Sequence, residues 1–172
     1  ITEGYTVAGF DSSAPSDSQM ITVSYKGKTA TYTVKIVEKL FPSSVFNGLK
    51  GKATVEYTHN SSYTGENEKE FIDDTAEGAL KSNSAGMGSS QVTVKITLND
   101  SLGTSKLHFD YSVSAETSSY GSVYDGLQIN GGSKIGNTNG FVSHSLNVKG
   151  GDVVTLTYAK DYSGDGGSDC IW

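Results

Sequence analysis

An acidic, glycine-rich loop near the carboxyl end carries the side chains best suited to chemistry. Asp161, Asp165 and Asp169 recur every four residues, with three glycines between the first and the last. Hard cations such as calcium bind oxygens from carboxylates and carbonyls, which flexible loops supply, although the spacing is not that of an EF-hand. We expect these three aspartates to be calcium ligands. Glu116 is a candidate fourth ligand, since a sandwich fold can bring the end of its strand close to this loop.

The same loop also admits an interpretation without a cation. Asp161 would then cap a turn, Asp169 would accept hydrogen bonds from main-chain donors, and Asp165 would be solvated. Both interpretations are open at the level of sequence, and calcium is the one cofactor that the sequence predicts.

Aromatic side chains near this loop suggest a second kind of site. Tyr120, Tyr124 and Tyr162 lie in or beside predicted loops, together with Trp172. Binding sites combine apolar surface with a few placed polar groups, and sugar rings stack on aromatic faces. We therefore predict ligand binding, to a glycan or a host surface protein, at the three tyrosines. The alternative is that Tyr124 and Trp172 serve the core.

Other reactive residues lack the spacing that catalysis requires. His59, His108 and His144 are far apart and form no zinc motif, and no G-x-S-x-G elbow is present. Strand phase places His108 outward and His144 at the edge of the core. Cys170 lies in an apolar ending without a cationic neighbour, so we expect a buried, unreactive thiol. We predict no catalytic residues and a chain that is not an enzyme.

Composition narrows the class of protein. The chain has 172 residues, a formal net charge of −6, 21 glycines and only 2 prolines. No basic stripe is available to neutralise phosphates, which argues against nucleic-acid binding. No apolar run reaches the roughly 18 residues of a membrane-spanning helix, so we predict no membrane insertion. A single cysteine cannot form an internal disulfide, and this usage favours a Gram-positive surface protein. The abrupt ends suggest a piece of something longer.

Alternating apolar residues predict an all-β chain. In the first 38 residues we expect a short strand around Tyr5–Val7 and a hairpin from about Met20 to Val37, turning at Lys26–Lys28. This stretch contains YTVAGFD at 5–11 and ITVSYKGKTATYTV at 21–34. It resembles the second half of a group-3 bacterial immunoglobulin-like domain, whose first half would precede Ile1. The resemblance implies a partial Ig-like segment over residues 1–38.

Residues 39–172 are predicted to form a separate sandwich. The strands that we expect here are Ala53–Thr58, Val92–Leu98, Lys106–Val113, Val123–Asn130, Phe141–Val148 and Val153–Lys160. Six short strands separated by turn residues favour a β-sandwich or jelly roll. For Glu66–Ser82 we expect a short helix or a loop with one helical turn.

This second unit has its own family resemblance. The motifs are SS at 89–90, LHFDYSVSAE at 107–116, YDGLQI at 124–129, YAKD at 158–161 and DCIW at 169–172. In this order they resemble jelly-roll modules, related to MAM and CUB sandwiches, of bacterial surface proteins. A closing Ile-Asp would follow Trp172, so the final strand is expected to be incomplete. Such modules are accessory domains without chemistry of their own.

These observations predict an extracellular, non-catalytic binding or adhesion module of a larger bacterial surface or secreted protein. A structural spacer domain without a ligand is the alternative from another class.

Overall fold

The computed structural model describes residues 4–10, 16–36, 43–61, 71–162, 164 and 166–172. The chain divides into two compact units, residues 1–40 and residues 41–172. Each unit has its own β-sheet structure.

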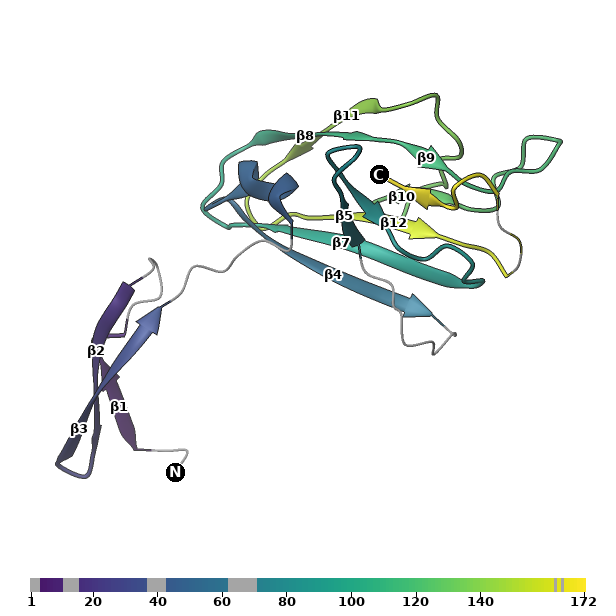
Figure 1. The fold of residues 1–172 in the computed structure, drawn as a ribbon. Coiled ribbons are helices and arrows are strands. Elements are labelled where there is room, and N and C mark those ends of the chain that lie inside the picture. Colours follow the sequence, from purple (N-terminus) through teal and green to yellow (C-terminus); the bar gives the residue numbers. More distant parts are fainter. Residues whose placement is uncertain (1–3, 11–15, 37–42, 62–70, 163, 165) are drawn as a thin grey trace. The chain divides into compact units, whose positions relative to one another are not determined.

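The first unit is one antiparallel sheet in the order β1-β2-β3 (Figure 1). The strands are β1 Tyr5–Ala8, β2 Ser16–Tyr25 and β3 Lys28–Ile36. Lys26 and Gly27 connect β2 to β3 with φ values of 47° and 75°, as a two-residue hairpin turn requires. The predicted hairpin is therefore confirmed. None of the residues whose burial is described in this unit is buried.

The second unit is built on a four-stranded antiparallel sheet in the order β10-β12-β7-β4. Its strands are β4 Ala53–Ser61, β7 Ser90–Leu98, β10 Gly126–Ile129 and β12 Val153–Ala159. Strand β7 shows most clearly why this sheet forms. Its buried side chains alternate with partly exposed ones, so Val92, Val94, Ile96 and Leu98 face the core.

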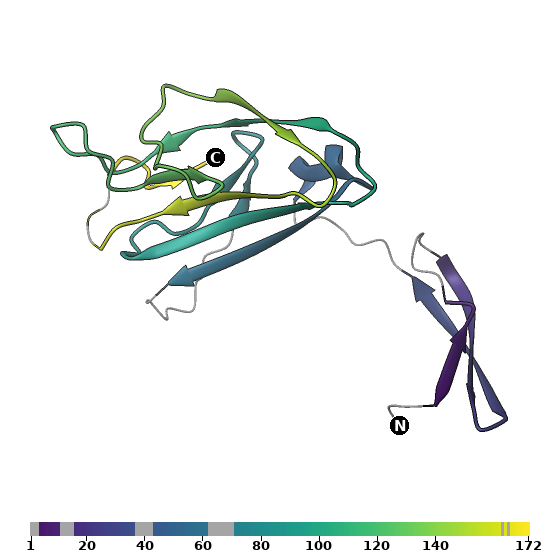
Figure 2. The ribbon, with the colours of Figure 1, turned by 180° about the vertical axis from the view of Figure 1, so that it is seen from behind.

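The remaining elements of this unit form the layer opposite this sheet (Figures 1 and 2). They are the 3-10 helix η1 Ser44–Leu49 and the strands β5 Phe71–Asp74, β6 Ala79–Ser82, β8 Ser105–Tyr111, β9 Val113–Ser114, β11 Val142–Val148 and β13 Cys170–Ile171. They pair as β5-β6, β11-β8 and β13-β9. Leu107, Val113 and Ile171 pack from this layer against the residues of β7. The prediction of an all-β sandwich is confirmed.

The helix or helical turn expected within residues 66–82 is wrong for the described part of that segment. Residues 71–82 form the β5-β6 hairpin, because Phe71 and Ser82 are buried and fix the two strands in register. Asp74 closes the turn by accepting a hydrogen bond of 3.1 Å from the Ala76 amide, and Gly78 takes a φ of 64°. Residues 66–70 lie outside the described part.

Within the described residues, no helix has the length and apolar character needed to cross a membrane.

Candidate functional site

A buried charge cluster lies where β12 ends and holds two loops in place. Lys160 follows β12, and its ammonium group lies 3.4 Å from Asp125 Oδ2 and forms an ion pair with Asp169. The three side chains are 1%, 0% and 4% exposed, respectively. Charges this deeply buried are tolerated only when they are paired and hydrogen-bonded. Lys160 is thus the shared cation of two carboxylates.

Neutral donors complete the coordination of the two carboxylates. Asp169 accepts hydrogen bonds from the Tyr158 hydroxyl at 2.7 Å and from the Gly86 amide at 2.9 Å. Asp125 accepts one from the Asp161 amide at 2.7 Å. Burial, followed by the hydrogen bond to Asp169, raises the pKa of Tyr158 far above its usual range. The phenol therefore stays protonated and acts as a donor.

This cluster brings the predicted site loops together. Glu116 accepts main-chain hydrogen bonds of 3.3 Å from Tyr124 and Asp125 at the start of β10. On its other side it contacts the acidic loop, where a Cβ on Gly166 would lie 2.7 Å from the Glu116 Cα. The two loops are packed too tightly there for a side chain. Residues 116–125 and the acidic loop therefore meet at one end of the sandwich.

The predicted calcium ligands occupy different environments. Asp169 is engaged by Lys160, and Asp165 lies outside the described residues. The main-chain amide of Asp161 donates a hydrogen bond to the Asp125 carboxylate, and its carbonyl oxygen accepts one from the Ser89 amide. Glu116 Oε2 is buried, has no hydrogen-bond partner among the described residues, and lies beside Gly164. The expected proximity of Glu116 to the acidic loop is therefore present.

Among the described residues, no group of three or more histidine, cysteine, aspartate or glutamate side chains is arranged to hold a metal ion. Asp165 lies outside the described residues, so calcium binding stays a prediction.

The three predicted ligand-binding tyrosines lie on the same two loops. Tyr120 is 97% exposed and Tyr162 is 86% exposed, whereas Tyr124 is 41% exposed. The loop bearing Tyr120 is closed by a bridge between Thr117 and Val123. Its backbone is fixed further by Ser118, whose hydroxyl accepts hydrogen bonds from the amides of Tyr120 and Ser122 at 3.2 and 2.8 Å. Tyr120 is thus presented to solvent from a braced turn.

Trp172 and Cys170 belong to the framework of this end of the sandwich. The Trp172 indole donates a 2.9 Å hydrogen bond to Asp74 Oδ2, and the ammonium group of Lys81 lies 5.0 Å from the ring centroid. The hydrogen bond from Trp172 lowers the pKa of Asp74. Cys170 is buried, and burial raises its pKa to about 11. The thiol is therefore protonated at neutral pH and a poor nucleophile.

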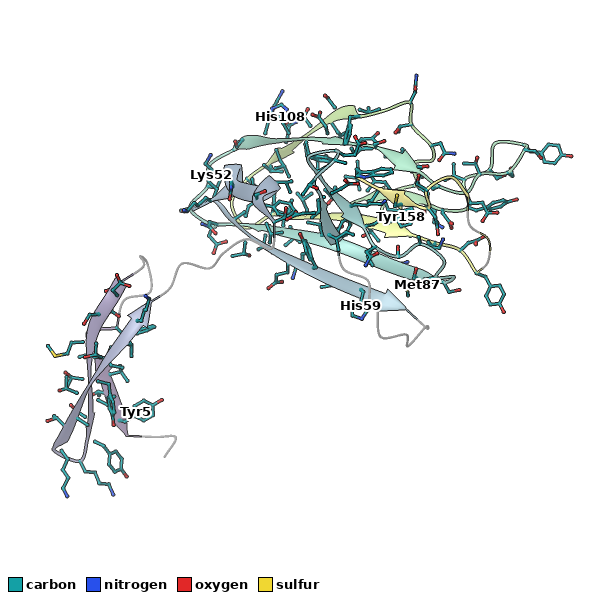
Figure 3. All side chains as sticks on the ribbon, viewed as in Figure 1. Tyr5, Lys52, His59, Met87, His108 and Tyr158 are labelled. Carbon is teal, nitrogen blue, oxygen red and sulfur yellow. The ribbon has the colours of Figure 1, made fainter. Side chains whose placement is uncertain are left out.

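The histidines lie on the β8-β11 pair and on β4. His108 is exposed and points outward from β8, as its strand phase predicted (Figure 3). His144 is half-buried, and its ring lies 5.4 Å from that of Phe109.

Sequence reasoning did not identify the charge cluster as a unit. The residues of the cluster occur in three motifs of the second unit: YDGLQI contains Asp125, YAKD contains Tyr158 and Lys160, and DCIW contains Asp169. A lysine that directly follows an apolar strand is normally assigned to the surface, because lysine is rarely buried. Only the fold shows that Asp125 and Asp169 converge on it.

Comparison with known proteins gives one match. Residues 2–36 match the family described as bacterial Ig-like domain (group 3). That match confirms the Ig-like prediction for the N-terminal segment. Domains of this family occur in bacterial surface proteins. No curated protein and no solved structure matches the chain. The jelly-roll resemblance of residues 39–172 therefore remains a hypothesis.

Proposed function

We propose that the chain is a non-catalytic binding module of a bacterial surface or secreted protein, and that the sandwich binds a glycan through Tyr120 and Tyr162, with Tyr124 at the margin. The Ig-like match of residues 2–36 and the all-β architecture support a surface-protein module. The exposure of the tyrosines supports the binding role.

One observation carries the binding proposal. Of the large apolar and aromatic side chains described as exposed, Tyr120 and Tyr162 are the two most exposed. The loop that bears Tyr120 contacts the acidic loop, which bears Tyr162, through Glu116. Each of the two loops also contributes a carboxylate to the Lys160 cluster. A side chain held on a fixed loop loses less conformational entropy on binding than one on a loose loop. Two such rings suit the flat apolar faces of sugars.

A glycan array of the full chain tests this proposal. We expect binding to one glycan class, and we expect Tyr120→Ala and Tyr162→Ala each to weaken it by about two- to tenfold, since an aromatic contact is worth roughly 0.5 to 1.5 kcal/mol. Tyr32→Ala is the matched control, because Tyr32 is 54% exposed but lies on β3. A blank array at high protein concentration contradicts the proposal and favours a spacer domain.

Calcium is proposed as the cofactor of the acidic loop, with Glu116, Asp161 and Asp165 as its ligands. The buried Glu116 Oε2 that lacks a partner among the described residues supports this assignment. Asp169 is not retained as a ligand, because Lys160 already compensates its charge.

A further inference from the structure

A large apolar groove lies in the layer opposite the four-stranded sheet of the second unit. Its volume is about 810 Å³, and its lining comes from η1, from β6 and the turn before it, from β8, and from the core face of the four-stranded sheet. The side chains that define it include Phe46, Leu80, Ile96, Leu107 and Phe109. The groove therefore lies in the second layer, between the β5-β6 hairpin and β8.

Strand β8 borders this groove with one of its two edges. The other edge pairs with β11 along its whole length, from Ser105 opposite Val148 to Tyr111 opposite Val142. Just past the end of β8, the Ser112 amide and carbonyl exchange hydrogen bonds of 3.0 and 2.9 Å with Trp172. In an antiparallel strand, every second residue directs its main-chain groups to the same edge. His108 and Asp110 therefore direct theirs toward the groove.

The main-chain groups of His108 and Asp110 are available for pairing. Within the described part of the chain, no hydrogen bond outside the β8-β11 ladder uses them. The side chains of this strand also fit a further neighbour. Leu107, Phe109 and Tyr111 turn toward the core, whereas His108 points to solvent (Figure 3). An apolar edge of this kind is a template for one more strand.

Strand β13 points along this edge. Ile171 lies opposite Val113, and Trp172 bonds to Ser112, so the chain runs antiparallel to β8 and toward its start. Continuing the same register, the first, third and fifth residues after Trp172 would lie opposite Tyr111, Phe109 and Leu107. On the far side, the Ile171 amide bonds to the Ser82 hydroxyl at 3.0 Å, at the end of β6. The direction of β13 is thus the direction of the groove.

We propose that this groove is the seat of one further β-strand, formed by polypeptide joined to Trp172, which runs between β6 and β8 with apolar side chains at its first, third and fifth positions. Such a strand would pair with the main-chain groups of His108 and Asp110, and its apolar side chains would contact Leu80 and Phe109 in the groove. The β13 pairing already sets its register, so seating it needs no new loop closure. A separate peptide in the same position would be less favourable, because it would also lose its translational and rotational freedom on binding.

Two extended versions of the full chain test this proposal. Each carries seven residues after Trp172, built from valine, threonine and lysine in the same composition. One version has valine at the first, third and fifth positions, and the control has valine at the second, fourth and sixth. A shift of one residue turns every valine to the other face. We expect only the first version to melt at least about 5 °C above the unextended chain.

Hydrogen exchange and dye binding give independent readouts. In the first version alone, the amides of His108 and Asp110 should become protected, and binding of the apolar dye anilinonaphthalene sulfonate should fall. Equal effects from both extensions, or no protection at His108 and Asp110, would overturn the proposal. The proposal is also overturned if the seven residues protect these amides only when they are added as a separate peptide, or if dye binding does not fall. Dimerisation of the unextended chain with protection of the same amides would overturn it as well.

Discussion

At the scale of single residues, Lys160 organises the second unit. It compensates two buried carboxylates, and Tyr158 and two main-chain amides supply the remaining hydrogen bonds. We expect Lys160→Met to lower the free energy of unfolding by about 3 to 5 kcal/mol, because it leaves two buried carboxylates without a cation. Urea denaturation of the purified variant measures this loss.

Lys95→Met is the matched control for this prediction. Lys95 lies 3.6 Å from Glu56 on the same sheet, but the two side chains are 42% and 51% exposed. A solvent-exposed pair of this kind contributes about 0 to 1 kcal/mol. If the two variants lose similar free energies of unfolding, the buried Lys160 cluster contributes no more to stability than an exposed ion pair.

At the scale of elements, the acidic loop is the place where calcium is predicted to act. A cation bound at micromolar affinity stabilises the native state by about 4 kcal/mol at millimolar concentration, because it binds the folded chain and not the unfolded one. For a chain of this size, the melting temperature should rise by roughly 8 to 16 °C. Magnesium should act less, because it requires tighter octahedral geometry. Differential scanning fluorimetry with calcium, magnesium or chelator provides the measurement.

Glu116→Gln separates this effect from a general response to salt. The substitution keeps the size of the side chain beside Gly164 and removes its charge, so the calcium shift should disappear. Glu56→Gln, on the exposed pair with Lys95, should retain it. If chelator leaves the melting curve of the unaltered chain unchanged, the loop is turn structure without a cation.

The elements also show how far sequence reasoning extends. Strand β7 was predictable because Val92, Val94 and Ile96 alternate with polar residues, and this period decides which face is buried. The β5-β6 hairpin was not, because two four-residue strands are too short to show a period. Its register depends instead on the burial of Phe71 and Ser82 in the assembled core.

The candidate site was predictable only in part, for a similar reason. Exposed tyrosines on turn-rich segments and the nearness of Glu116 to the acidic loop followed from strand order and composition. The role of Asp169 did not, since an aspartate in a glycine-rich loop has the same local sequence whether it meets calcium or Lys160. That choice depends on residues far apart in the chain, such as Gly86 at 2.9 Å.

At the scale of the whole molecule, the two units differ in how they are stabilised. All of the buried core side chains in the described residues lie between Phe46 and Ile171, so the hydrophobic core belongs to the second unit. The three strands of the first unit bury none of the side chains whose burial is described. Small sheets without a covered face have marginal stability of their own.

Removing residues 1–40 should therefore leave the melting temperature of the second unit within about 2 °C of its value in the full chain, since independent sites contribute additively to stability. Calorimetry of the full chain and of residues 41–172 compares the two directly. The shorter chain should also keep the glycan binding proposed for Tyr120 and Tyr162. A fall of more than about 5 °C would show that the sandwich draws stability from the Ig-like segment, because a change of that size corresponds to more than about 1 kcal/mol in a chain of this length.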